Sequence, residues 1–316
     1  MAASLKDALE KTSEFISTAI GRYGNNLFGS IVFGSLVKGT WRKSSDVDII
    51  LLFNKCNYSR SVSFYGDLKF EVYNMPLKVF FSPFSGDGKN LFFDMFRLQV
   101  LRTGKILYER DNLLSQLFTK LREQRISRRY LDEALSKFYN LINAAEIYLS
   151  RGRIEKAELS LRDSSINLAR ALLMKINIPE INTPRLLIPH LRERSPELYE
   201  VIREVYGLNY VGRNEAETRI REVKETLNNI KRRFKRNIRL KGVIDMVENE
   251  LLSAEDCLED GDYDSAILQA EFSQSILIKN PFMRNEYWLH TSKPNIERRD
   301  IKECIGLLRE IKEKYL

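Results

Sequence analysis

The first third of the chain alternates short apolar runs with turn residues, a pattern typical of strands joined by tight connections. The runs expected to form strands or extended segments lie at 31–33, 47–53, 68–73, 77–81 and 104–109. Apolar residues at helical spacing occupy 5–20 and 90–101, and they predict one helix before the first strand and another before the last. A small domain with both strands and helices is therefore expected at the start of the chain.

The remainder of the chain changes to apolar residues three and four positions apart, which indicates amphipathic helices. The stretches that carry this pattern are 131–142, 159–172, 198–205 and 216–230, and prolines interrupt it between 178 and 196. A partial repeat links 145–157 with 254–266, because each contains Ala-Glu, Leu, Gly and Ala at the same offsets. Both copies predict a helix, a glycine-containing turn and a second helix, which suggests two related hairpin modules.

These patterns together predict an α+β fold, with a small mixed sheet and flanking helices followed by an all-helical bundle. We expect the sheet domain at 1–112, a first helical domain at 113–235 and a second helical module at 236–316. The basic run 231–241 lies at the second boundary. It predicts a linker or an exposed helix face, with RNA contact as an alternative.

The amino-acid composition limits the class of protein but does not indicate which reaction it catalyses. Of the 316 residues, 43% are hydrophobic, which supports a real core, and no run reaches the roughly 20 apolar residues that a membrane span needs. Lys and Arg number 51 against 43 Asp and Glu, so the net charge of +8 favours a polyanionic partner such as a nucleotide or RNA. A surface rich in Lys, Arg and Glu is also typical of thermophiles. The three scattered cysteines and the lack of a signal-peptide core predict a reducing, cytoplasmic location.

Two acidic residues stand at the start of the second predicted strand. Asp46 and Asp48 are separated by one residue, and alternate residues of a strand share a face, so both carboxylates are expected to project together. Such a pair is usually held together by a divalent cation. The first strand ends at Gly34-Ser35, a turn whose backbone N–H groups and hydroxyl suit the triphosphate of a nucleotide.

Three basic residues follow that turn, in the loop between the two predicted strands. Lys38, Arg42 and Lys43 either contact nucleotide phosphates or lie in a solvated loop, and for each of them both interpretations stay open. Together with Gly34 and Ser35 they form the expected set of nucleotide-binding residues.

The complete pattern is Gly-Ser, ten residues, and then Asp, one residue and Asp, between two strands. It resembles the DNA polymerase β nucleotidyltransferase superfamily, in particular the minimal nucleotidyltransferases of prokaryotes. The resemblance implies transfer of a nucleoside monophosphate, most often AMP from ATP, to a hydroxyl of a protein, an RNA or a small molecule. It also implies that Asp46 and Asp48 bind Mg²⁺ or Mn²⁺, which neutralises the triphosphate.

This superfamily usually supplies a third carboxylate from a later strand. The matching strand is expected at 77–81, where the position holds Lys78, whose ammonium would compete with a metal ion. Glu71, or else Asp67, is then the candidate for the substitute catalytic acid, and a surface position without a catalytic role is the alternative for Glu71. The alternative is a catalytically degenerate protein that binds nucleotide or RNA, or regulates a partner, without turnover.

The helical part, with its Ala-Glu, Gly and Ala hairpins, resembles the HEPN domains that commonly accompany minimal nucleotidyltransferases. The resemblance implies a domain that presents the acceptor. Some HEPN domains are ribonucleases that use Arg followed by His, and two pairs match this loosely: Arg185 with His190, and Arg284 with His290. The apolar helix faces also allow a homodimer, and no membrane partner is expected.

Overall fold

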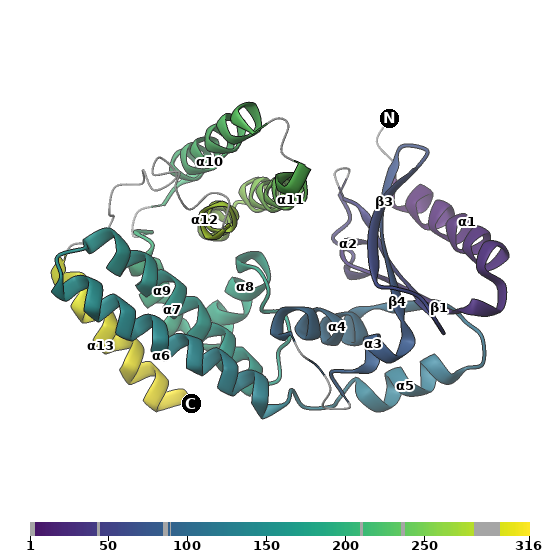
Figure 1. Cartoon of the computed structure of the whole chain (residues 1–316), viewed down its shortest axis with the longest axis horizontal. Helices are drawn as coiled ribbons and strands as arrows, with labels where there is room; N and C mark the ends of the chain where they lie inside the picture. Colours follow the sequence, from purple (N-terminus) through teal and green to yellow (C-terminus); the bar gives the residue numbers. More distant parts are fainter. Residues whose placement is uncertain are drawn as a thin grey trace. The chain divides into compact units, whose positions relative to one another are not determined.

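The computed structural model of the chain describes residues 4–42, 45–84, 88, 90–208, 211–234, 238–280 and 298–316. The chain divides into two compact units, Met1–Ser127 and Arg128–Leu316. The first unit contains the sheet and the second is helical (Figure 1). The predicted α+β class, a mixed sheet with flanking helices and then a helical region, is confirmed. The expected domain boundaries at 112 and 235 stay predictions.

Five strands form one mixed sheet in the order β3-β4-β2-β1-β5. Their bounds are Leu27–Phe33 (β1), Val47–Phe53 (β2), Ser59–Tyr65 (β3), Leu68–Pro76 (β4) and Lys105–Glu109 (β5). β2 pairs antiparallel with β1 and parallel with β4, while β3 and β5 form the two edges through antiparallel pairs. The central strands β1 and β2 are buried almost throughout, as their continuous apolar runs predict.

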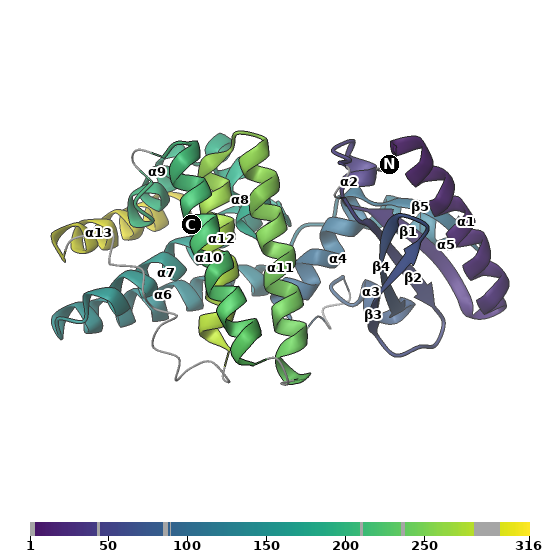
Figure 2. The same cartoon turned by 90° about the horizontal axis from the view of Figure 1, so that it is seen from above.

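Helices cover the two faces of the sheet (Figures 1 and 2). α1 (Leu5–Tyr23) packs through Ala8, Ile16 and Ala19 on the face that contains Val47 and Ile49. α3 (Leu77–Phe81), α4 (Leu91–Thr103) and α5 (Leu113–Leu121) contribute to the core on the opposite face. A short helix, α2 (Ser35–Lys38), follows β1, and a turn of 3₁₀ helix, η1 (Gly24–Asn26), precedes it. The two predicted helices are confirmed as α1 and α4.

One expectation in this unit is wrong, and one strand was not predicted. Residues 77–81 form helix α3 instead of a strand, because a short apolar run does not distinguish a buried helix from a strand. Pro76 ends β4 immediately before this helix, and a proline has no N–H with which to extend the ladder. The edge strand β3 was not expected, because its alternating Ser, Arg, Val and Phe residues are largely exposed and lack an apolar run.

The second unit consists of helices in its described residues. Their bounds are Arg128–Ser150 (α6), Ile154–Lys175 (α7), Pro184–Arg194 (α8), Pro196–Val205 (α9), Arg213–Arg233 (α10), Ile238–Glu259 (α11), Tyr263–Lys279 (α12) and Arg298–Tyr315 (α13). α6 packs on α7, whereas α10, α11 and α12 lie side by side (Figure 2). Within the described residues, none of the helices combines the length and the apolar character that crossing a membrane requires.

The two copies of the partial repeat form helical hairpins with the same turn. In the first, Gly152 has a φ of +70° and the amide of Arg153 donates to the carbonyl of Tyr148 at 2.9 Å. In the second, Gly261 has a φ of +77° and the amide of Asp262 donates to the carbonyl of Cys257, also at 2.9 Å. The pairs α6–α7 and α11–α12 are therefore built on equivalent turns, and the expected helix, turn and helix are present in both.

The proline-rich stretch interrupts the helices between α7 and α8, since residues 176–183 are not helical, but its later prolines lie within helices. Pro184 and Pro196 occupy the first turns of α8 and α9, where the missing N–H of proline has no intrahelical partner to lose. Pro189 lies inside α8, which continues to Arg194. The stretch between 178 and 196 is thus largely helical.

Candidate active site

Strand pairing brings the predicted acidic residues to one face of the sheet. Asp48 is the second residue of β2, and its partner across the parallel pair is Glu71 of β4. On the other side of β2, Asp48 is paired with Phe33, the last residue of β1. Residues paired across adjacent strands share a face, so Glu71 lies beside Asp48, and Asp46 lies on the same side just before the strand.

The Gly34 turn packs directly against the same carboxylate. Gly34 has a φ of +75°, a backbone conformation that other residues rarely adopt. A Cβ atom at this position would collide with the side chain of Asp48. The predicted glycine-serine turn and the predicted acidic strand end therefore converge at the junction of β1, α2 and β2.

Basic and phenolic groups hold two of the three carboxylates. Lys69 Nζ donates to Asp46 Oδ2 at 2.6 Å. Arg60 forms an ion pair with Glu71, with its Nε atom 2.9 Å from Oε1. The hydroxyl of Tyr73 donates to the other oxygen, Oε2, at 2.6 Å. Glu71, only 8% exposed, is thus fixed from two sides.

Burial and neighbouring carboxylates raise the pKa values of two aspartates at this site. Burial raises the pKa of Asp48 well above its usual value, and the nearby carboxylates of Glu71 and Asp46 raise it further. Burial also raises the pKa of Asp46, although its hydrogen bond with Lys69 acts in the opposite direction. The site therefore has an excess of negative charge at Asp48 that a proton or a cation would relieve.

Part of the sheet unit is similar to a known protein family. Residues 22–113, which contain the whole sheet, match the model of the family described as "Polymerase beta, Nucleotidyltransferase". Residues 22–113 therefore form a nucleotidyltransferase domain. Among solved structures, a nucleotidyltransferase-like protein from Exiguobacterium sibiricum is similar at 14% identity with a TM-score of 0.44, over 96% of this chain and 91% of that one. No curated protein matches the chain.

The other predicted phosphate-binding residues of the nucleotidyltransferase domain lie around the turn. Ser35 is the first residue of α2 and is half-buried, and Lys38 ends this helix with an exposed side chain. Arg42 is half-buried in the following loop, where its amide donates to Ser45 Oγ at 3.0 Å. Lys43 lies outside the described residues.

Lys78 does not occupy the position that the sequence suggested. It lies on helix α3 and is exposed, whereas the strand paired in parallel with β2 is β4. The residue beside Asp48 on that strand is Glu71, an acid. The expectation that a lysine stands in place of the third carboxylate is therefore wrong, because it placed 77–81 in the sheet.

The donor chemistry of the nucleotidyltransferase domain suits a hard divalent cation, since carboxylate oxygens are the ligands that Mg²⁺ and Mn²⁺ prefer. The raised pKa of Asp48 is consistent with a position that a cation would stabilise. Within the described residues, however, no three His, Cys, Asp or Glu side chains converge closely enough to hold a metal ion. Asp46 and Glu71 are instead paired with Lys69 and Arg60, with which a metal would compete.

Sequence reasoning missed Arg60, Lys69 and Tyr73. Lys69, Glu71 and Tyr73 alternate along β4, so a period of two places them on one face, and this signal was available. Arg60 was missed because it lies on the unexpected strand β3, where it pairs with Tyr73. Only the pairing of β3 with β4 brings its guanidinium to Glu71.

The structure describes one of the two predicted Arg and His pairs, both of which belong to the helical unit. Arg185 Nη1 forms an ion pair with Asp256 Oδ2 at 2.8 Å, and its amide donates to Gln269 Oε1 at 3.0 Å. His190 is half-buried on the same helix, α8. Arg284 and His290 lie outside the described residues. The ribonuclease interpretation and the resemblance to HEPN domains stay predictions.

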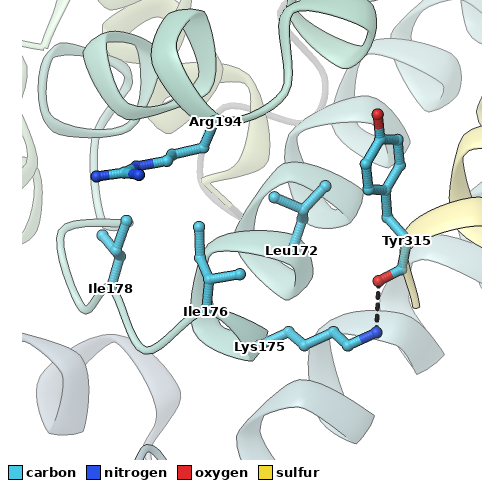
Figure 3. A pocket seen from close by; sticks show the side chains of 6 residues that line it. All are labelled: Leu172, Lys175, Ile176, Ile178, Arg194 and Tyr315. Carbon is cyan, nitrogen blue, oxygen red and sulfur yellow. Dashed lines mark hydrogen bonds between the residues drawn. The ribbon is translucent and has the colours of Figure 1, made fainter.

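The helical unit also contains a pocket of about 570 Å³ (Figure 3). Its lining combines apolar and basic side chains, and consists of Leu172, Lys175, Ile176, Ile178, Arg194 and Tyr315. Lys175 Nζ donates to the carbonyl of Tyr315 at 2.6 Å, and Arg194 is paired with Glu193. Both cations of the pocket thus already have partners within the helical unit.

Proposed function

We propose that this protein is a nucleotidyltransferase that transfers a nucleoside monophosphate, AMP from ATP, to an acceptor hydroxyl with Mg²⁺ or Mn²⁺. In this reaction the acceptor oxygen forms a bond to the α-phosphorus and the bond to pyrophosphate breaks. The acceptor is a molecule that carries a hydroxyl, in a protein, an RNA or a small molecule.

One observation carries the proposal. Asp48 of β2 and Glu71 of β4 are direct partners across the parallel pair, and Gly34 packs against Asp48. A phosphate-binding turn and carboxylates on one face of a sheet are the groups that phosphoryl chemistry needs, because catalysis there depends on positioning and charge stabilisation. The match of residues 22–113 to nucleotidyltransferases supports the same conclusion.

Each residue has a separate proposed role. Asp46 and Asp48 hold the divalent cation, which when bound neutralises the triphosphate and lowers the pKa of the attacking hydroxyl. Gly34 and Ser35 hold the phosphates through the turn after β1, with Lys38, Arg42 and Lys43 as further cationic contacts. Glu71 accepts the acceptor proton, and its contacts with Arg60 and Tyr73 hold its carboxylate in place.

The test uses the full chain with ATP labelled at the α-phosphate, Mg²⁺ or Mn²⁺, and total RNA and protein as acceptors. The wild type is expected to label an acceptor and release pyrophosphate, and Asp46→Ala with Asp48→Ala is expected to abolish both. Asp111→Ala is the matched control, because Asp111 is an exposed aspartate that follows β5 at the opposite edge of the sheet from β3. Labelling that persists in the double variant would reject the proposal.

A second function, nucleotide or RNA binding without turnover, is favoured by the ion pairs of the site. Lys69 and Arg60 balance the charges of Asp46 and Glu71, so these carboxylates have partners without any metal. In this case ATP binding measured by calorimetry would be the same with and without Mg²⁺, and no pyrophosphate would form. Metal-dependent binding followed by pyrophosphate release would exclude it.

A further inference from the structure

An apolar surface continues the candidate active site onto the edge strand of the sheet. Val62 and Phe64 of β3 are 49% and 73% exposed, and we call these two residues the β3 shelf. Val62 is the cross-strand partner of Glu71, and Phe64 is the partner of Lys69. The shelf therefore lies on the same face as the carboxylates.

An exposed aromatic side chain at this position is unusual. Edge strands usually avoid exposed apolar side chains, because their unpaired backbone groups already favour association with other chains. The opposite edge strand, β5, has a smaller exposed apolar residue, Leu107, which is 36% exposed. Exposed apolar residues beside a polar site often mark a surface that binds a partner or a ligand.

The order of the strands places the β3 shelf on the side of the carboxylates away from Gly34. Gly34 follows β1, the carboxylates of Asp48 and Glu71 lie on β2 and β4, and the shelf lies beyond them on β3. In phosphoryl transfer the attacking and leaving oxygens are roughly in line on opposite sides of the phosphorus. If the turn at Gly34 holds the leaving pyrophosphate, the hydroxyl approaches over β4 and β3.

The groups around the β3 shelf suit an unpaired base next to phosphates. Phe64 offers the face of an aromatic ring, and Val62 extends the apolar area towards Glu71. Lys69 and Arg60 lie on the same face, and although they are paired with Asp46 and Glu71, both stay partly exposed and can also contact a phosphate. Single-stranded nucleic acids bind through this combination of base stacking on aromatic rings and phosphate contacts with basic residues.

We propose that the acceptor is the end of a single-stranded nucleic acid whose terminal base stacks on Phe64 and lies over Val62. This inference rests on the proposed nucleotidyl transfer, since it identifies which molecule presents the hydroxyl. The net charge of +8 favours such a polyanion over an acidic protein acceptor. Phe64 is thereby a specificity-determining residue of the site.

The test measures binding without ATP or metal, so it does not depend on turnover. Fluorescence anisotropy follows labelled 12-nucleotide RNA and DNA strands of the same sequence, with a blunt duplex for comparison. Phe64→Ala is expected to weaken binding of the single strands about tenfold, whereas Phe64→Trp keeps it, because one stacked base contributes roughly that much. Leu107→Ala, at the opposite edge of the sheet, is the matched control and leaves the affinity unchanged. The RNA and DNA arms show which strand is preferred.

Several results would overturn the inference, and they differ from failure of the proposed transfer. Equal affinity of Phe64→Ala and wild type for single strands rejects it, even if the wild type transfers AMP. Weaker ATP binding with unchanged strand binding would assign the shelf to the donor base instead. A dimer in sedimentation that becomes a monomer in Phe64→Ala would assign it to a second copy of this chain. Lack of pyrophosphate release in the wild type with Phe64-dependent strand binding would reject the transfer alone.

Discussion

Gly34 connects backbone conformation with the chemistry of the candidate site. Its φ of +75° and ψ of −151° lie in a region that is open almost only to glycine, and its Cα faces the carboxylate of Asp48. Gly39, five residues later, has a similar φ of +73° but nothing within 4 Å of an added Cβ. A substitution at Gly39 therefore causes backbone strain alone, whereas one at Gly34 causes backbone strain and a collision with Asp48.

Gly34→Ala is expected to lower both stability and transfer activity, because it adds a collision with Asp48 to the strain of a positive φ. Urea unfolding should show a loss of more than about 2 kcal/mol. Gly39→Ala is the control and should cost about 1 kcal/mol, since only strain applies. Equal losses in the two variants would contradict the close packing of Gly34 on Asp48.

A second prediction at the residue scale follows from the raised pKa of Asp48. A carboxyl whose pKa is higher in the folded than in the unfolded state costs no stability below its unfolded pKa, and the cost grows as pH rises towards the folded pKa. Asp48→Asn removes the ionisable group, so without metal its melting temperature should exceed that of the wild type at pH 8. The difference should shrink as the pH is lowered towards 4, and each unit of pKa elevation corresponds to about 1.4 kcal/mol. A difference that does not change with pH would show that the effect is not ionisation.

At the scale of elements, the two helical hairpins provide an internal comparison. Asp262 precedes α12 with a φ of −88° and a ψ of 75°, and its side chain accepts from the amide of Ser265 at 3.2 Å. Arg153 precedes α7 with nearly the same backbone angles, −91° and 70°, but makes no side-chain cap. The same turn is thus capped in one hairpin and uncapped in the other.

Arg153→Asp is expected to raise the free energy of unfolding by about 1 kcal/mol, because the new carboxylate can cap α7 as Asp262 caps α12. Arg153→Ala is its control, since it removes the cation without adding a cap. Asp262→Ala should have the opposite effect and cost about 2 kcal/mol, because it removes both the cap and the ion pair with Arg192. Denaturant unfolding measures all three, and no gain in Arg153→Asp beyond Arg153→Ala would contradict the equivalence of the turns.

Several helices and strands could be predicted from the local spacing of apolar residues alone. β1, β2, β4, β5, α1 and α4 form close to where apolar spacing predicts them. The pattern failed at 77–81, where an apolar run of strand length forms a helix, and at β3, where an edge strand has few buried side chains. Both errors lie where burial depends on what packs against the segment, which local sequence does not contain.

At the scale of the whole molecule, the three cysteines differ in burial between the two units. Cys257 and Cys304 belong to the helical unit, and burial raises the pKa of each thiol to about 12. Cys56, in the sheet unit, is only partly buried, and burial raises its pKa as well. The thiolate is the reactive form, so buried thiols with raised pKa values should be protected.

In the native protein at pH 8, Cys56 is expected to react with a thiol reagent first, and Cys257 and Cys304 about a hundredfold more slowly or not at all. All three should react at once in concentrated denaturant, where burial is lost. Cys56→Ser is the control and should remove the fast phase alone. Two fast thiols in the native state would show that the helical unit opens readily.

The sequence by itself determined the glycine-serine turn at Gly34-Ser35, the acidic strand end at Asp46 and Asp48, and the change from sheet to helices, because all of these follow from spacing within one segment. Tertiary structure alone decided that Glu71, rather than Lys78, lies beside Asp48, and that Arg60 and Lys69 form ion pairs with Glu71 and Asp46. These contacts depend on which strands pair and in which register. Register is a property of two paired segments together, so the apolar pattern of either segment alone does not determine it.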